Sequence, residues 1–245
     1  MVFAILFLIL HWFFSLFLHS FFLHRYCAHH QFKMSKNTEK FFYFLTYLAQ
    51  GPSFLNPKSY SIMHQLHHEH SDTKEDPHSP YFYKNIWSMM LKTYKTYREF
   101  MIIDPKLVSH KVIHHYPEWK IVDQFARSKI NILFWGVIYT SIYYYFTNIY
   151  FILICVPIHC FMGPFQGAIV NWCGHKIGYR NFPLEDKSRN TFFQDFFLMG
   201  ELYQNNHHQD KMRSNFAVKW FEVDPTYLMM IILQKIHVIK IKTKV

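Results

Sequence analysis

The chain has 245 residues, of which 51% are hydrophobic and 20% aromatic, a composition that argues against an ordinary soluble domain. Its formal net charge is 26 − 16 = +10, but every charged residue lies between Arg25 and Lys129 or between Lys176 and Lys244. Residues 1–24 and 131–175 carry no charge. Because long uncharged stretches are typical of membrane-spanning segments, the basic charge does not indicate nucleic-acid binding. The four cysteines form no C-x-x-C pair, which argues against a zinc ribbon.

Three apolar segments follow one another along the chain. Residues 1–23 are about the ~20 residues that cross a bilayer, and they lack the basic start and cleavage site of a signal peptide, so we expect a transmembrane helix. Residues 41–55 are shorter and are interrupted by a Gly-Pro pair, which predicts a re-entrant or short membrane helix. Residues 131–172 are long enough for a transmembrane hairpin that breaks near Asn148 or Pro157.

The charge distribution predicts the topology. The basic residues place both charged blocks in the cytoplasm, and the two crossings of the hairpin return the chain to that side. The amphipathic run Leu228–Ile239 predicts a helix lying on the membrane surface. No internal repeat or flexible linker is present, so residues 1–245 are expected to form a single domain. The predicted fold is therefore an all-α, multi-pass integral membrane protein, with transmembrane helices capped by a cytoplasmic helical lobe.

The eighteen histidines outnumber the acidic residues and gather in clusters. The clusters are His24 and His29; His64, His67 and His68; His175, four residues after Asn171; and His207 and His208, with Gln204 where a second H-x-x-H-H would have its first histidine. Residues three or four apart share a helix face, so the H-x-x-H-H histidines are expected to converge on one volume. His24 and His29 are five apart and need either two metals or a distorted helix end. Eight imidazoles exceed the four ligands of one zinc ion and favour two metal ions.

The other histidines are expected to have different roles. Those inside apolar segments are predicted to form interhelical hydrogen bonds, and they are His11, His19 and His159. Those in a charged stretch are predicted to be surface residues, and they are His110, His114 and His115. Asp76 and His78 trail the second cluster and are candidates for groups that support the metal ligands from behind.

Four segments together resemble the membrane fatty-acyl desaturase family, in its acyl-CoA desaturase-like branch. They are HRYCAH, HQLHHEHSDTKEDPHSP, NWCGHKIGYR and GELYQNNHH, and the resemblance covers roughly residues 5–210. Carried over by position, the family's di-iron ligands fall on His24, His29, His64, His67, His68, His175, His207 and His208, and Asn171 matches a residue that reaches one iron through water. Gln204 stands where many relatives have histidine and is a further candidate ligand. The resemblance implies no catalytic side chain beyond the metal ligands.

The resemblance implies an oxidoreductase that uses two Fe²⁺ ions and O₂ to introduce a cis double bond into a long-chain acyl group during unsaturated fatty acid biosynthesis. The acyl group would be carried by CoA, by acyl-carrier protein or by a lipid. Electrons would come from a separate protein of the ferredoxin or haem cytochrome type. The lipid bilayer is an expected partner, nucleic acid is not, and the active site is expected on the cytoplasmic side.

Two other functions remain open from the sequence. A membrane di-iron hydroxylase or alkane monooxygenase uses similar clusters, but the four residues between His24 and His29, the D-P-H after the second cluster and the pair Asn171 and His175 favour the desaturase. A metal-storing or metal-transporting protein would have ligands along its spans, whereas these cluster at one face. A single helix precedes the first cluster, where longer relatives carry two.

Overall fold

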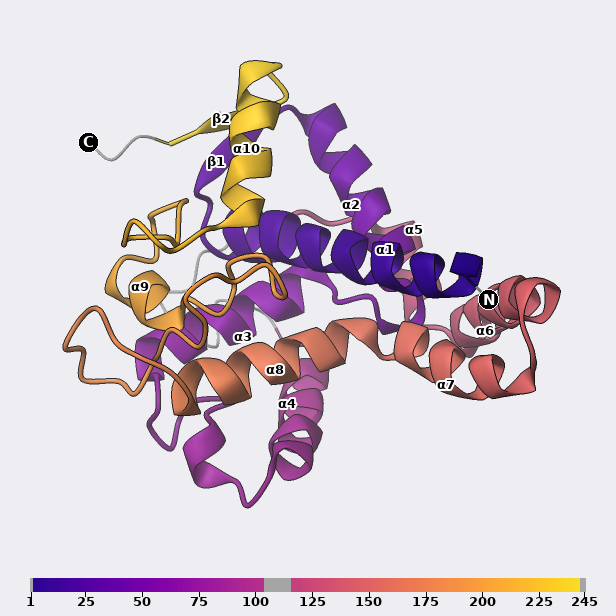
Figure 1. Cartoon of the computed structure of the whole chain (residues 1–245), viewed down its shortest axis with the longest axis horizontal. Helices are drawn as coiled ribbons and strands as arrows, with labels where there is room; N and C mark the ends of the chain where they lie inside the picture. Colours follow the sequence, from indigo (N-terminus) through magenta and orange to yellow (C-terminus); the bar gives the residue numbers. More distant parts are fainter. Residues whose placement is uncertain (1, 104–115, 243–245) are drawn as a thin grey trace.

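The computed structural model describes residues 2–103 and 116–242. Helix α1 (Val2–Leu18) continues without interruption into the π-helix η1 (His19–Ala28). Large apolar side chains of α1 are exposed as far as Phe14, whereas nearly every residue of η1 is buried. The first helix therefore runs from an exposed apolar surface into the centre of the molecule (Figure 1). By length and composition, Val2–Ala28 is the one described helix that could cross a membrane unaided.

The predicted hairpin consists of three helices, α6 (Lys129–Phe146), α7 (Ile149–Cys160) and α8 (Met162–Lys176). The chain breaks at both predicted places. Asn148 caps α7 by accepting hydrogen bonds from the backbone N–H groups of Tyr150 and Phe151. Helices α7 and α8 then meet at a bend of 66°, four residues after Pro157, and together they could form a second span. After the bend, α8 continues below α1 in the view of Figure 1 and contacts it.

The segment predicted at 41–55 is helical, but the helix begins earlier. Helix α2 (Lys36–Gln50) starts where the Ser35 side chain accepts a hydrogen bond from the backbone of Thr38. It ends at Gly51, whose φ of 52° suits glycine and which opens the short 3₁₀ turn η2 (Gly51–Ser53). Helix α3 (Pro57–His70) follows and packs directly on η1.

A two-stranded antiparallel ribbon departs from the all-α prediction. Strand β1 (Phe32–Met34) pairs with β2 (Ile239–Ile241), and Phe32 and Ile239 are buried on one face of the ribbon. The predicted surface helix is α10 (Pro225–Lys235), which ends before Ile239 because the backbone turns through His237 at a φ of 59°. Three-residue strands that lie 200 residues apart leave no periodic pattern in the sequence, so the prediction of an all-α fold was wrong at this point.

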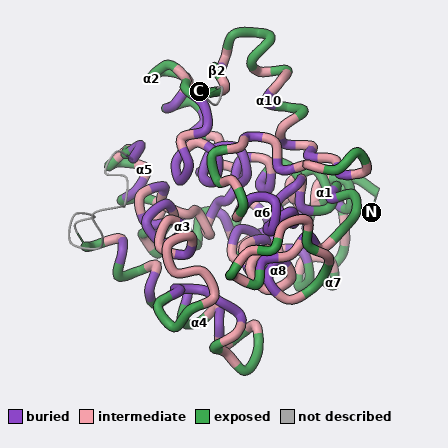
Figure 2. The backbone as a smooth tube through the Cα atoms, turned by 90° about the vertical axis from the view of Figure 1, so that its left-hand side faces the viewer, coloured by how far each residue is buried: buried purple, intermediate pink, exposed green. Residues whose placement is uncertain are grey.

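Four further elements complete the described part of the chain. They are the 3₁₀ turn η3 (Pro80–Phe82), α4 (Ile86–Phe100), α5 (Lys120–Ala126) and α9 (Gln204–Gln209). Buried chain gathers at the centre of the molecule, whereas α10, α2 and α4 extend outwards and carry exposed residues (Figure 2). The largest apolar cluster is built on η1, with contributions from β1, α2 and α10. The end of the first helix that carries the histidines is thus held within the largest apolar cluster.

Candidate metal centre

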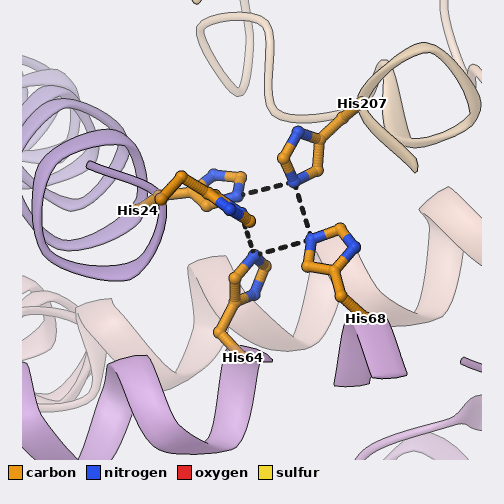
Figure 3. Close-up of side chains that lie close together, drawn as sticks. His24, His64, His68 and His207 are labelled. Atoms are coloured by element: carbon orange, nitrogen blue, oxygen red, sulfur yellow. Dashed lines mark hydrogen bonds between the residues drawn. The ribbon is translucent and has the colours of Figure 1, made fainter. Parts of the chain in front are cut away.

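Five histidines bring their ring nitrogens together in what we call the first group. Its members are His24 of η1, His29 just after it, His64 and His68 of α3, and His207 of α9, with one nitrogen of each within 4.8 Å of all the others. The Nε2 atoms of His64 and His68 are 3.0 Å apart, and those of His68 and His207 are 2.9 Å apart. Figure 3 shows the side chains of His24, His64, His68 and His207 pointing towards one another from η1, α3 and α9. A neutral all-nitrogen set of this kind suits a transition-metal ion.

The π-helix explains how His24 and His29 join one group although they are five residues apart. In η1 each turn is widened to an i→i+5 hydrogen-bonding pattern, and the N–H of His29 donates to the carbonyl oxygen of His24 over 3.2 Å. Residues five apart therefore lie on adjacent turns and face the same way. Of the two alternatives that the sequence left open for this pair, two metals or a distorted helix end, the structure has the distorted helix end.

Three histidines form a second group beside the first. They are His67 of α3, His175 of α8 and His208 of α9, again within 4.8 Å. The Nε2 atoms of His67 and His208 are 3.2 Å apart. Adjacent residues on a helix point about 100° apart, so each H-H pair is divided between the two groups. The expectation that His64, His67 and His68 converge on one volume was wrong for this reason.

Carboxylates hold four of these histidines by their second nitrogen. The Nδ1–H groups donate to carboxylate oxygens in the pairs His24–Glu201 (2.5 Å), His67–Asp76 (2.9 Å), His175–Asp72 (2.9 Å) and His208–Asp186 (2.8 Å). A metal-ligating histidine usually makes such a bond, which fixes its tautomer and leaves Nε2 free to ligate. Asp76, a candidate supporting group from the sequence, is one of these four carboxylates. Glu201, Asp72 and Asp186 were missed, although Asp72 belongs to the same acidic motif as Asp76.

The protonation states suit metal ligation. Burial and the neighbouring histidines hold the pKa of His29, His64 and His207 well below the usual 6.5. Burial also acts to lower the pKa of His67, but the charge and hydrogen bond of Asp76 raise it overall. Burial opposes ionisation of Glu201, yet His24 and Arg25 bring its pKa down to about 2. His29, His64 and His207 are therefore neutral at pH 7, the form that binds metals.

Asn171, Gln204 and His78 lie near the two groups, and His78 forms a further cluster with His67 and Asp76 in which one ligand atom of each lies within 4.8 Å of the others. The Gln204 side chain is buried, and its NH₂ donates to the backbone oxygen of Glu201 over 2.6 Å. The His78 ring is buried with its centroid 4.4 Å from that of His67, and neither of its nitrogens has a hydrogen-bond partner among the described residues. All three side chains line a common cavity.

The histidines that were expected to lie outside the metal site differ in their contacts. His11 and His159 lie with their Nδ1 atoms 2.6 Å apart, and Nε2 of His159 is 2.7 Å from the hydroxyl of Tyr143, so the predicted interhelical hydrogen bonds are confirmed for this pair. His19 instead packs edge-on against Tyr60 at the cavity wall. His110, His114 and His115 lie outside the described residues.

Comparison with known proteins identifies the family. The sequence model of the family described as fatty acid desaturase matches residues 1–227. The chain belongs to the fatty acid desaturase family. It is 25% identical over 214 residues to an acyl-CoA C20 Delta5-desaturase of Anemone leveillei, 26% over 223 residues to an sn-1 stearoyl-lipid 9-desaturase of Anabaena variabilis, and 27% over 234 residues to a hex-5-enoyl-[acyl-carrier protein] acetylenase of Moorena producens.

These alignments cover 86%, 86% and 89% of the chain and 64%, 73% and 70% of the three relatives. The chain spans about two thirds of the length of the curated relatives it matches. The predicted family is confirmed, and with it the class of acyl desaturase. All eight histidines and their four carboxylates lie inside the matched region, whereas β2 lies beyond it.

A cavity of about 230 Å³ gives this fatty acid desaturase family member a space beside the histidines. His24 and His64 of the first group form part of its wall, together with Asn171. The rest of the wall is largely apolar and includes Leu16, Phe54, Met63 and Val170. A flexible hydrocarbon chain fits an apolar space of this kind better than a polar substrate does.

Proposed function

We propose that the protein is an O₂-dependent acyl desaturase in which each histidine group holds one iron ion. The observation that carries the proposal is the pair of adjacent imidazole groups, which four carboxylates hold in place and the first of which forms part of the wall of an apolar cavity. The first iron would be held by His24, His29, His64, His68 and His207, and the second by His67, His175 and His208 with Asn171 and Gln204. The donor set fits, because Nε2 of His175 is buried in its group with no hydrogen-bond partner among the described residues.

The reaction balances with a separate one-electron carrier protein as reductant. An acyl –CH₂–CH₂– unit loses two hydrogens and becomes –CH=CH–, while O₂ takes up those hydrogens, two electrons and two further protons to give two waters. Bound iron would supply the redox chemistry with O₂ that side chains cannot. The chain's own residues hold the ligands in place through Glu201, Asp72, Asp76 and Asp186, and the apolar cavity walls keep water from the acyl chain.

The acyl carrier and the electron donor are further parts of the proposal. The names of the three relatives mention acyl-CoA, a lipid and acyl-carrier protein, so the family accommodates all three carriers. The donor is a ferredoxin or haem cytochrome type protein. Both must reach the two histidine groups, where His68 and His208 are only partly buried.

We place the protein in a bilayer as a multi-pass, single-domain protein. The part that contains the two histidine groups, which we call the histidine lobe, would lie on the cytoplasmic side. Exposed apolar side chains cover α1 up to Phe14 and continue on α6 and α7, for example at Leu133 and Leu153, which are 68% and 65% exposed. Side chains of this kind are stable when lipid surrounds them. Residues 1–24 and 131–175 carry no charge, and the basic excess of the rest of the chain supports this placement by the positive-inside rule.

The test is expression of the chain in a desaturase-deficient host, with fatty acid profiling and metal analysis of the purified protein. We expect an unsaturated product and two irons per chain, and we expect both to be lost in a His64→Ala, His67→Ala variant. A hydroxylated product would indicate the hydroxylase alternative. One tightly bound zinc and no iron would overturn the proposal.

A further inference from the structure

One face of α8 forms a continuous wall of the cavity. Its members are Gly163, Pro164, Gln166, Gly167, Val170 and Asn171, whose spacing of three and four residues places them in a row along the helix. At one end, Asn171 lies one turn before His175 of the second group. At the other end, the backbone N–H of Gly163 donates to the Ser53 hydroxyl over 3.4 Å, so the row ends against η2.

Gly167 lies in the middle of this row, at the position with the most room for a larger side chain. A Cβ atom built on Gly167 meets no other heavy atom within 4 Å. At Gly163 it would contact the backbone oxygen of Ser53 at 3.4 Å, and at Gly174 it would overlap Cγ of Gln204. Gly167 therefore opens into free space within the cavity wall, whereas the other two glycines of α8 face protein atoms.

We propose that Gly167 determines how long an acyl chain the cavity accepts. The inference rests on the proposed desaturase function and deepens it. A side chain at this position would project into the cavity about one turn, ~5.4 Å, from Asn171, and would separate the histidine end of the space from the end at Gly163. An acyl chain that needs both parts would no longer fit, whereas a chain that needs only the histidine end would.

The experiment compares Gly167→Ala, Gly167→Leu and Gly136→Leu with the unaltered chain. Gly136 in α6 is a matched control because it is also half-buried and helical, has no heavy atom within 4 Å of a built Cβ, and does not line the cavity. Replacing either glycine has the same effect on helix propensity. Each variant is expressed in a desaturase-deficient host that is fed a graded series of saturated fatty acids, and the unsaturated products are measured.

Gly167→Leu should reduce conversion of the longest accepted substrates at least tenfold and spare the shortest ones, with Gly167→Ala between it and the unaltered chain. Iron content and the size-exclusion profile should stay unchanged in both, and Gly136→Leu should keep the original preference. If Gly167→Leu does not fold, the shift of Gly167→Ala decides, since a single methyl group meets no neighbour. An unaltered length preference in a folded Gly167 variant overturns the role of Gly167 alone. An unaltered chain that desaturates none of the substrates overturns the proposed function itself.

Discussion

Asp186 illustrates how a single carboxylate can affect a metal group that it does not enter. It accepts the Nδ1–H of His208 over 2.8 Å and is partly exposed, so it can be replaced without leaving a buried charge unpaired. Asp186→Asn should weaken iron binding about 10–100-fold, because the histidine loses the charge that orients it and raises its basicity. Iron retained by purified protein under chelator competition measures the effect. The neighbouring Glu185→Gln, at an exposed position, is the control, and equal retention in both variants would contradict the assigned role of Asp186.

Gln204 presents a second test at the level of one residue. On α9 it precedes His207 by three residues and His208 by four, so it is placed beside both groups. If its amide oxygen binds or orients iron, Gln204→Ala should lower iron content and product together, and Gln204→His, which restores the commoner histidine, should keep both. Metal analysis and product yield are measured on the same preparations. Full iron content and unaltered yield in Gln204→Ala would show that the residue only fills space.

The histidines were predictable from the sequence, but most of their partners were not. Clusters such as H-x-x-H-H place several ligands on one short helix. Their proximity follows from the local helix geometry and does not depend on how the rest of the chain folds. Glu201 lies 177 residues from His24, and Asp72 lies 103 residues from His175. No local pattern joins such residues. Asp76 was found because it is only nine residues from His67.

At the level of secondary structure, the difficult features are those where a helix departs from regularity. The sequence offers a distorted helix end as one of two explanations for the spacing of His24 and His29, but it does not indicate that the distortion extends over the ten residues of η1. It likewise offers Asn148 and the Pro157 region as alternative breaks, whereas the chain uses both. An apolar run predicts that a helix is present, but the ends of the helix, its π-turns and its bends depend on what packs around it.

The ribbon of β1 and β2 is expected to stabilise the core through Ile239. Ile239 is 4% exposed and packs in the cluster that surrounds η1, whereas Ile236 is 61% exposed. Ile239→Ala should lower the free energy of unfolding by about 2–4 kcal/mol, because it removes buried methyl groups and leaves a cavity. Ile236→Ala is the matched control and should change it by less than about 0.5 kcal/mol. Thermal unfolding in one detergent compares the two, and equal melting temperatures would show that the ribbon does not support the core.

The molecule as a whole combines an apolar half with a histidine lobe that contains most of its buried charge. Arg25 illustrates the connection, since it is fully buried, pairs with Glu201 and Asp224, and lies against the Phe216 ring with its Cζ 3.9 Å from the ring centroid. These contacts join the end of the first helix to two distant segments of the lobe. Removing one member of a buried charge pair commonly costs several kcal/mol. The lobe is therefore expected to respond as a unit when its charges change.

Acidification tests this response in the metal-free protein. Burial and mutual repulsion hold the pKa of His29, His64, His68 and His207 well below 6.5, and burial brings that of His208 to about 4. Below pH 6.5 the unfolded chain binds protons that the folded chain does not, so stability is full above that pH and is lost as the pH falls towards the folded values. Each such histidine costs about 1.4 kcal/mol per pH unit. His67, whose pKa is raised, acts in the opposite direction but is a single residue.

We therefore expect the melting temperature of metal-free protein to fall as the pH drops from about 6.5 towards 4, because in this interval the histidines bind protons in the unfolded chain but not in the folded one. A His64→Gln, His68→Gln variant should show a shallower fall, because two of the buried imidazoles that drive it are gone. In iron-loaded protein the same histidines must stay unprotonated to bind metal, so iron should be released over the same pH range in which the metal-free protein loses stability. A melting temperature that is independent of pH in the metal-free protein would show that the histidine groups are hydrated rather than buried.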